Sequence, residues 1–179
     1  MRSSRRGCSS PSPFPPSPMP NLSTSASPLS LPHPDRLGRV LFQWDADRFE
    51  HAIEFGADRI ACRSGADGLA WPDSPPIQQL SIESIEGREV ALGVGCAGTS
   101  HWSLSVEPTP DGFRFDWACR VKETPKQLGT SYDASAAMRV VPEDLSTVVL
   151  DDAAMRIQPD GPIASTGTFR WCYTVRPAS

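Results

Sequence analysis

The chain has 179 residues, of which 19 are proline, and a formal net charge of −4. This length allows one domain together with a tail. No run of about 18 apolar residues occurs, which excludes a transmembrane helix. We therefore expect a cytoplasmic protein that makes no membrane contact.

Charge is divided unevenly along the sequence. The first 36 residues carry +3, which leaves −7 for the remainder, and that remainder has only two lysines. Domains that bind nucleic acid usually present clustered Lys and Arg side chains to the phosphate backbone. The acidic balance therefore argues against a nucleic-acid partner.

Residues 1–36 are rich in serine and proline, with nine of the 19 prolines and ten serines. Their few large apolar residues follow no period, so the segment cannot bury enough surface to offset the entropy lost on ordering. We expect residues 1–36 to form a disordered tail and residues 37–179 to form a single folded domain. Met1 and Met19 are both candidate starts, and either one leaves this domain intact.

The domain begins with two runs of alternating apolar residues, over 40–44 and 49–55, separated by an Asp-Ala-Asp turn. A period of two is typical of a half-buried strand, and two such runs around a turn predict a hairpin. His51 falls among the apolar positions of the second run. We expect it to face inward and to be hydrogen-bonded. A short apolar run at 59–63 and a loop over 64–76 follow.

The clearest hairpin signal lies in the middle of the chain, where residues 101–107 and 113–121 alternate on both sides of a Pro-, Asp- and Gly-containing turn. Before it, residues 89–94 predict a buried strand, whereas residues 77–85 fit either a strand or a helical turn. The face of 113–121 opposite its apolar residues carries charged side chains. We expect these to be wetted and to form cross-strand ion pairs.

The last third of the chain predicts short strands after a polar connection over 122–136. Short strands are expected at 138–141, 147–150 and 154–157, and a longer final strand at 168–175. Altogether about eight to ten short strands and no long helix are expected. This pattern is typical of an antiparallel β-sandwich or a barrel, and we favour the sandwich.

Cysteine and histidine spacing gives no metal signature. Cys62, Cys96, Cys119 and Cys172 are far apart and never form a Cys-x-x-Cys pair. His33 lies in the tail, and neither His51 nor His101 begins a tight His-x-Asp/Glu pair. We therefore expect no metal and no cofactor. Two disulfides among these cysteines stay open as an alternative to free thiols.

Gly93 to Gly98 match the G-x-G-x-x-G pattern of dinucleotide-binding loops. Such a site needs a helix after the loop, because the helix N-terminus holds the pyrophosphate. The residues that follow alternate as a strand instead. Gly95 and Gly98 are better explained by a tight turn, or by close approach of another backbone or a ligand.

The same loop brings together the types of side chain used in nucleophilic catalysis. Cys96 or Ser100 would be the nucleophile and His101 its base, with Glu107 or Asp116 as the third member. No family signature such as G-x-S-x-G surrounds them. The alternative is that Cys96 packs and His101 forms hydrogen bonds on the hairpin surface.

Trp71 lies outside any strand pattern, in a loop with several prolines. An exposed Trp here would suit contact with a ligand or a protein, with Asp67 and Asp73 flanking it. Alternatively, Trp71 folds back over one open end of the sandwich. The loop containing Trp71 and the loop containing Gly95 and Gly98 are expected to lie together at that end.

Binding residues usually lie in loops on a rigid β scaffold. The favoured function is therefore a non-catalytic binding or interaction module, whose partner is an unknown protein or a small-molecule ligand. Its contact residues would be Trp71, Asp67, Asp73, Gly95 and Gly98. The alternatives are a small hydrolase or transferase that uses Cys96 or Ser100 with His101, and a structural subunit of a larger assembly that pairs through a sheet edge or face.

Overall fold

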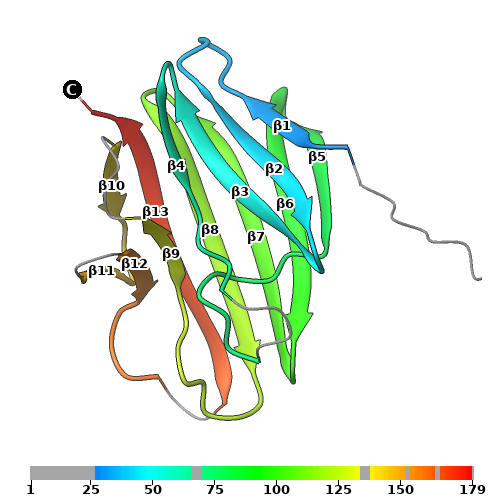
Figure 1. Ribbon diagram of the computed structural model, residues 1–179, viewed down its shortest axis with the longest axis vertical. Coiled ribbons are helices and arrows are strands. Elements are labelled where there is room, and N and C mark those ends of the chain that lie inside the picture. Colours follow the sequence, from blue (N-terminus) through cyan, green and yellow to red (C-terminus); the bar gives the residue numbers. More distant parts are fainter. Residues whose placement is uncertain (1–26, 66–69, 134–137, 152–153, 164–165, 179) are drawn as a thin grey trace, which may run out of the picture.

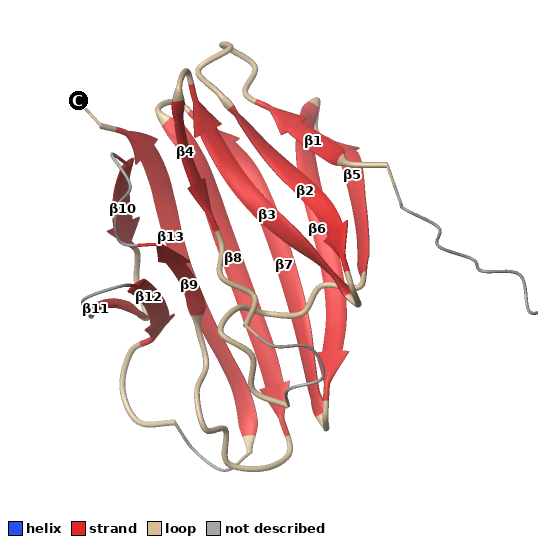
Figure 2. Ribbon diagram, in the orientation of Figure 1, coloured by secondary structure: helices blue, strands red, loops and turns tan. Residues whose placement is uncertain are grey.

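The computed structural model describes residues 27–65, 70–133, 138–151, 154–163 and 166–178. These residues form strands and loops and no helix (Figure 2). None of them therefore belongs to a helix long and apolar enough to cross a membrane. The strands are β1 (Leu29–Pro32), β2 (Arg39–Asp45), β3 (Arg48–Phe55), β4 (Asp58–Ala61), β5 (Gln79–Ile85), β6 (Arg88–Ala97), β7 (Ser100–Thr109), β8 (Gly112–Val121), β9 (Thr130–Asp133), β10 (Met138–Pro142), β11 (Ser146–Leu150), β12 (Ala154–Pro159) and β13 (Gly167–Pro177).

The strands form three antiparallel sheets. A four-stranded sheet of order β1-β2-β3-β4 covers one face of a six-stranded sheet of order β10-β13-β8-β7-β6-β5 (Figure 1). The third sheet, of order β11-β12-β9, continues the smaller layer, because a β-bridge joins Cys62 to Tyr132 of β9. The expected all-β antiparallel sandwich is confirmed.

The central hairpin has the predicted alternation. β7 and β8 pair so that Leu104 lies opposite Trp117, and Trp171 of β13 continues this buried row. The opposite face of β8 carries the expected ion pairs, including Arg114 with Glu107 and Asp116 with Arg170. A strand with one buried and one wetted face is what a period of two requires.

The described residues contain thirteen strands, more than the eight to ten expected. The ambiguous stretch 77–85 contains β5, and the connection 122–136, expected to be a loop, contains β9. β1, β4 and β9 have four residues each. Such short strands show too few alternations to be recognised by period.

The domain begins earlier than residue 37. β1 pairs with β2, and Leu31 and His33 are buried although they belong to the segment expected to be tail. Pro32 is tolerated because β1 is an edge strand. The composition of the first 36 residues as a whole gave no indication of β1, because this short strand is held by backbone pairing with β2 and by one buried leucine, Leu31. Residues 1–26 of the expected tail lie outside the described part of the chain.

A chain of polar groups crosses the aromatic core. The Nε2 atom of His51 lies 2.8 Å from the Tyr132 hydroxyl, which lies 2.7 Å from the Tyr173 hydroxyl. Trp117 donates its Nε1 hydrogen to Tyr173 at 3.2 Å. Burial lowers the pKa of His51 to about 3, so the ring is neutral. The expectation of an inward-facing, hydrogen-bonded His51 is confirmed.

The cysteines at positions 62, 96, 119 and 172 are free thiols. Cys62 accepts a hydrogen bond from the backbone N–H of His51, at 3.2 Å. Burial raises the pKa of the thiols of Cys62 and Cys119 to about 12. These two thiols act as small core residues, as the apolar pattern around Cys119 had indicated.

Candidate functional site

A cleft lies where three turns meet at one end of the sandwich. They are the β1–β2, β5–β6 and β7–β8 turns. The last two share an end because β6 and β8 run in the same direction within an antiparallel sheet. The cleft has a volume of about 340 Å³ and is lined by Pro32, His33, Pro34, Asp35, Gly87, Arg88, Glu89, Pro108, Thr109 and Pro110.

Two Pro-x-Pro segments form walls of this cleft. One is Pro32-His33-Pro34, which ends β1, and the other is Pro108-Thr109-Pro110, which leads into the β7–β8 turn. A proline ring fixes φ, so these walls lose little conformational freedom when a ligand binds. We call them the two proline walls.

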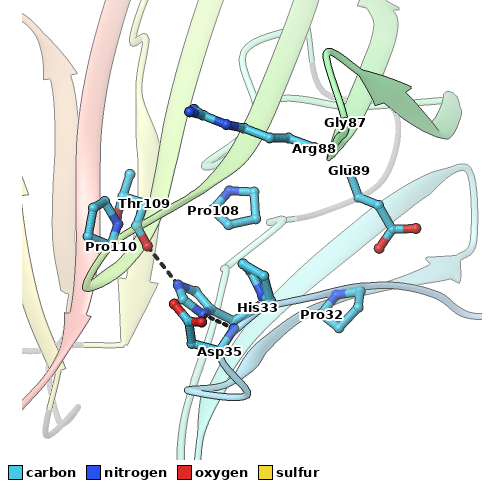
Figure 3. A pocket seen from close by; sticks show the side chains of 10 residues that line it. Pro32, His33, Asp35, Gly87, Arg88, Glu89, Pro108, Thr109 and Pro110 are labelled. Carbon is cyan, nitrogen blue, oxygen red and sulfur yellow. Dashed lines mark hydrogen bonds between the residues drawn. The ribbon is translucent and has the colours of Figure 1, made fainter.

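The middle residues of the proline walls hold them together. His33 donates from Nε2 to the carbonyl oxygen of Thr109 at 2.6 Å, and its Nδ1 accepts the backbone N–H of Asp35 at 3.1 Å (Figure 3). A carbonyl only accepts, so this pattern requires the neutral tautomer with its proton on Nε2. The ring also packs edge-on against Phe113, at 5.6 Å between centroids. His33 is therefore fixed in place by the fold.

Charged side chains stand at the rim. Asp35 comes from the β1–β2 turn, and Arg88 and Glu89 from the start of β6 (Figure 3). All three residues are exposed. Rigid apolar walls with a few charges at the rim resemble the general composition of small-molecule sites.

Sequence reasoning missed this cleft. The available signal was the pair of Pro-x-Pro segments, whose middle residues His33 and Thr109 are 76 positions apart. The composition of residues 1–36 predicts that His33 belongs to the tail, although His33 is buried and lines the cleft. Nothing in a period of two indicates which turns meet at the same end.

The residues singled out in the sequence lie at the other end. Trp71 is half-buried and packs against the core, and its carbonyl oxygen accepts a hydrogen bond from Gln127 at 3.0 Å. Asp73 accepts from the same amide at 3.1 Å and lies 3.6 Å from the Arg156 guanidinium. These contacts favour Trp71 folded over the sandwich end. Asp67 lies outside the described residues.

Gly95 and Gly98 let the Trp71 loop pack against β6 and the β6–β7 turn. A Cβ atom on Gly95 would lie 1.8 Å from the carbonyl oxygen of Pro76, and one on Gly98 would lie 3.2 Å from Ala70. Gly98 also has a φ of 55°. The two loops lie together as expected, and the glycines provide the close approach of another backbone.

Strand alternation separates the candidate catalytic residues. Ser100 is buried and donates its hydroxyl to the Ala97 carbonyl at 2.6 Å, whereas His101 is exposed on the opposite face of β7. Cys96 is exposed and pairs directly with His101 across the hairpin, so their side chains share a face. The sulfur of Cys96 lies 3.6 Å from Oε1 of Gln78. The cleft does not include these residues.

A cluster of charges on the outer face of the six-stranded sheet also escaped sequence analysis. Partial burial opposes ionisation of Glu143, but hydrogen bonds from Thr174, Arg114 and Cys172 outweigh it and lower its pKa. The hydrogen bond to Glu143 raises the pKa of Arg114. Burial, together with the hydrogen bond to Glu143, raises the pKa of Cys172 to about 12. A protonated thiol is a poor nucleophile, so we interpret the cluster as structural.

Among the described residues, no three His, Cys, Asp or Glu side chains are grouped so as to hold a metal ion. Comparison with protein-family models, with curated proteins and with solved structures finds no match to this chain.

Proposed function

We propose that this chain is a non-catalytic binding module and that its ligand occupies the cleft between the two proline walls. The observation that carries the proposal is the hydrogen bond from His33 to the Thr109 carbonyl, which joins the walls. A site whose walls are joined before the ligand arrives loses less entropy on binding.

The cleft suits a small molecule with an apolar body and a charged or polar end. Its volume of about 340 Å³ is at the lower end of the range for ligand pockets. Proline rings offer rigid apolar contact, while Arg88, Asp35 and Glu89 supply charges of both signs. The location in turns on a β scaffold is typical of binding sites.

Binding is favoured over catalysis by the state of the only imidazole in the lining. A general base needs a free nitrogen lone pair directed at the substrate. In His33, Nε2 donates to Thr109 and Nδ1 accepts from Asp35, so neither nitrogen is available.

The test is a fragment screen followed by two-dimensional amide NMR of the full-length, ¹⁵N-labelled chain. Fragments that bind are expected to shift the amide signals of the non-proline residues among 33–36, 87–89 and 109–112. The double variant Arg88→Ala/Glu89→Ala should weaken these fragments by roughly threefold to tenfold, because the exposed charges orient the ligand. The matched control is Lys122→Ala/Glu123→Ala, which removes the same pair of charges at the other end of the sandwich.

Two results would overturn the proposal. One is a screen in which every bound fragment shifts signals only outside the three turns. The other is equal loss of affinity in the Lys122/Glu123 control variant and in the Arg88/Glu89 variant.

The cross-strand pairing of Cys96 with His101 favours a second candidate, a hydrolase or transferase that uses this thiol. An activated thiol should react with iodoacetamide faster than a free cysteine at pH 7, and His101→Gln should slow it by about tenfold. A rate like that of free cysteine, unchanged by His101→Gln, would reject this candidate.

A further inference from the structure

β11 is an edge strand whose sequence is apolar and β-branched. It forms one edge of the third sheet and, among the described strands, pairs in a ladder only with β12. Its residues are Ser-Thr-Val-Val-Leu, with no charge and no proline. An uncharged edge strand without proline presents backbone N–H and C=O groups on which another strand can pair.

The largest concentration of exposed apolar side chains in the described residues lies at this edge. Seven large apolar residues are exposed in the described part of the chain, and three of them lie at this edge: Leu145, Val149 and Leu150, at 69%, 46% and 70%. Leu145 precedes β11 directly and has a φ of 67°. Three exposed apolar side chains within six positions are more than isolated surface residues and indicate a contact surface.

Acidic residues stand at both ends of the strand. Asp144 precedes Leu145, and Asp151 follows Leu150. The backbone N–H of Asp160 donates to the Leu145 carbonyl at 2.8 Å, which places a further acid at the first end. Charges that flank an apolar strand restrict which strands can pair with it.

This charge pattern decides between occupants. Two copies of β11 paired antiparallel with Thr147 opposite Val148 would bring Asp144 of one copy opposite Asp151 of the other, and like charges disfavour that pairing. The chain is also acidic as a whole. A segment with basic ends would instead meet an acid at each end of β11.

We propose that the edge of β11 binds an extended peptide segment with a β-branched apolar centre and Lys or Arg at its ends. Backbone pairing along the strand would supply register, Val149 and Leu150 would contact the apolar centre, and the flanking acids would select the basic ends. This surface is separate from the cleft between the proline walls, so either proposal can fail without the other.

The test uses the full-length chain and two fluorescein-labelled peptides, KKTVTVKK and EETVTVEE, in fluorescence anisotropy. The basic peptide is expected to bind at least tenfold more tightly than the acidic one, with an affinity that falls as salt screens the charges. Val149→Ser/Leu150→Ser should weaken the basic peptide by about tenfold. The control Val94→Ser/Leu92→Ser changes the same two residue types, also exposed, on β6.

A second pair of variants tests the acids separately. Asp144→Asn/Asp160→Asn should weaken the basic peptide by roughly fivefold, whereas Asp45→Asn/Asp58→Asn, at exposed turns of the four-stranded sheet, should leave it unchanged.

Several outcomes would overturn the assignment. Equal binding of the two peptides would show that the flanking acids do not select basic ends. If the β6 control loses as much affinity as the β11 variant, the peptide does not bind specifically at the edge of β11. A concentration-dependent dimer in light scattering that Val149→Ser/Leu150→Ser abolishes would show that the edge pairs with a second copy instead.

Discussion

The buried neutral His51 predicts a specific loss of stability in mild acid. In the unfolded chain this histidine should titrate near its ordinary pKa of 6.5, whereas burial lowers its pKa in the folded protein to about 3. Between these values the unfolded state binds a proton that the folded state does not. The contribution of His51 to stability is therefore fully present above pH 6.5 and is lost as the pH falls toward 3.

The size of this loss follows from the two pKa values. Each unit of difference is worth 1.36 kcal/mol, so about 3.5 units correspond to a maximum of about 5 kcal/mol. Between pH 7.5 and pH 5 the expected loss is about 2 kcal/mol. Domains of this size have total stabilities of about 5–15 kcal/mol, so the effect is large enough to measure.

The assay is urea unfolding at pH 7.5, 6 and 5, carried out on the parent chain and on His51→Gln. Glutamine can still form a hydrogen bond to Tyr132 but does not titrate. The cost of the substitution itself in unfolding free energy is therefore the same at each pH. Carboxylates and the other histidines contribute equally to both proteins. The difference in unfolding free energy between the two should shrink by about 2 kcal/mol from pH 7.5 to pH 5. A difference that stays constant over this range would refute the argument.

Three further predictions concern packing, the polar network and the thiols. Gly95→Ala should lower the free energy of unfolding by about 3 kcal/mol, because a Cβ would lie 1.8 Å from the Pro76 carbonyl oxygen; a loss below about 1 kcal/mol in urea would mean that the Trp71 loop moves aside easily. Tyr132→Phe should cost about 2–3 kcal/mol, since it removes the hydroxyl between His51 and Tyr173, and an unchanged denaturation midpoint would contradict this. In a Cys8→Ser background, Ellman's reagent should label only Cys96 in the native protein, because Cys62, Cys119 and Cys172 are buried. The three buried thiols should react after unfolding. Rapid labelling of a second thiol in the native protein would disprove this prediction.

The sequence alone determined the class of the fold and the faces of its long strands. A period of two in residues 101–107 and 113–121 needs no knowledge of distant partners, because alternate side chains of any strand point to opposite faces. The same reasoning placed His51 inside the core and predicted the ion pairs of β8. It also indicated the role of Gly95 and Gly98, since a strand after a glycine-rich loop excludes a dinucleotide site.

Only the tertiary structure decided what lies beside what. β1 is an edge strand of four residues within a Ser- and Pro-rich segment, and its pairing with β2 depends on backbone groups that composition does not reveal. The neighbour of His101 was also decided by strand register, which places Cys96 directly opposite it across the β6–β7 pair.

The cleft shows the same limit most clearly. His33 and Thr109 are 76 positions apart and meet because two hairpin turns of the large sheet and the β1–β2 turn lie at one end of the sandwich. Strand order and direction, which set that arrangement, come from long-range pairing. Local sequence patterns indicate which face of each strand is buried but not which strands are its neighbours. The turns could therefore be located in the sequence, but not the fact that three of them meet to form the cleft.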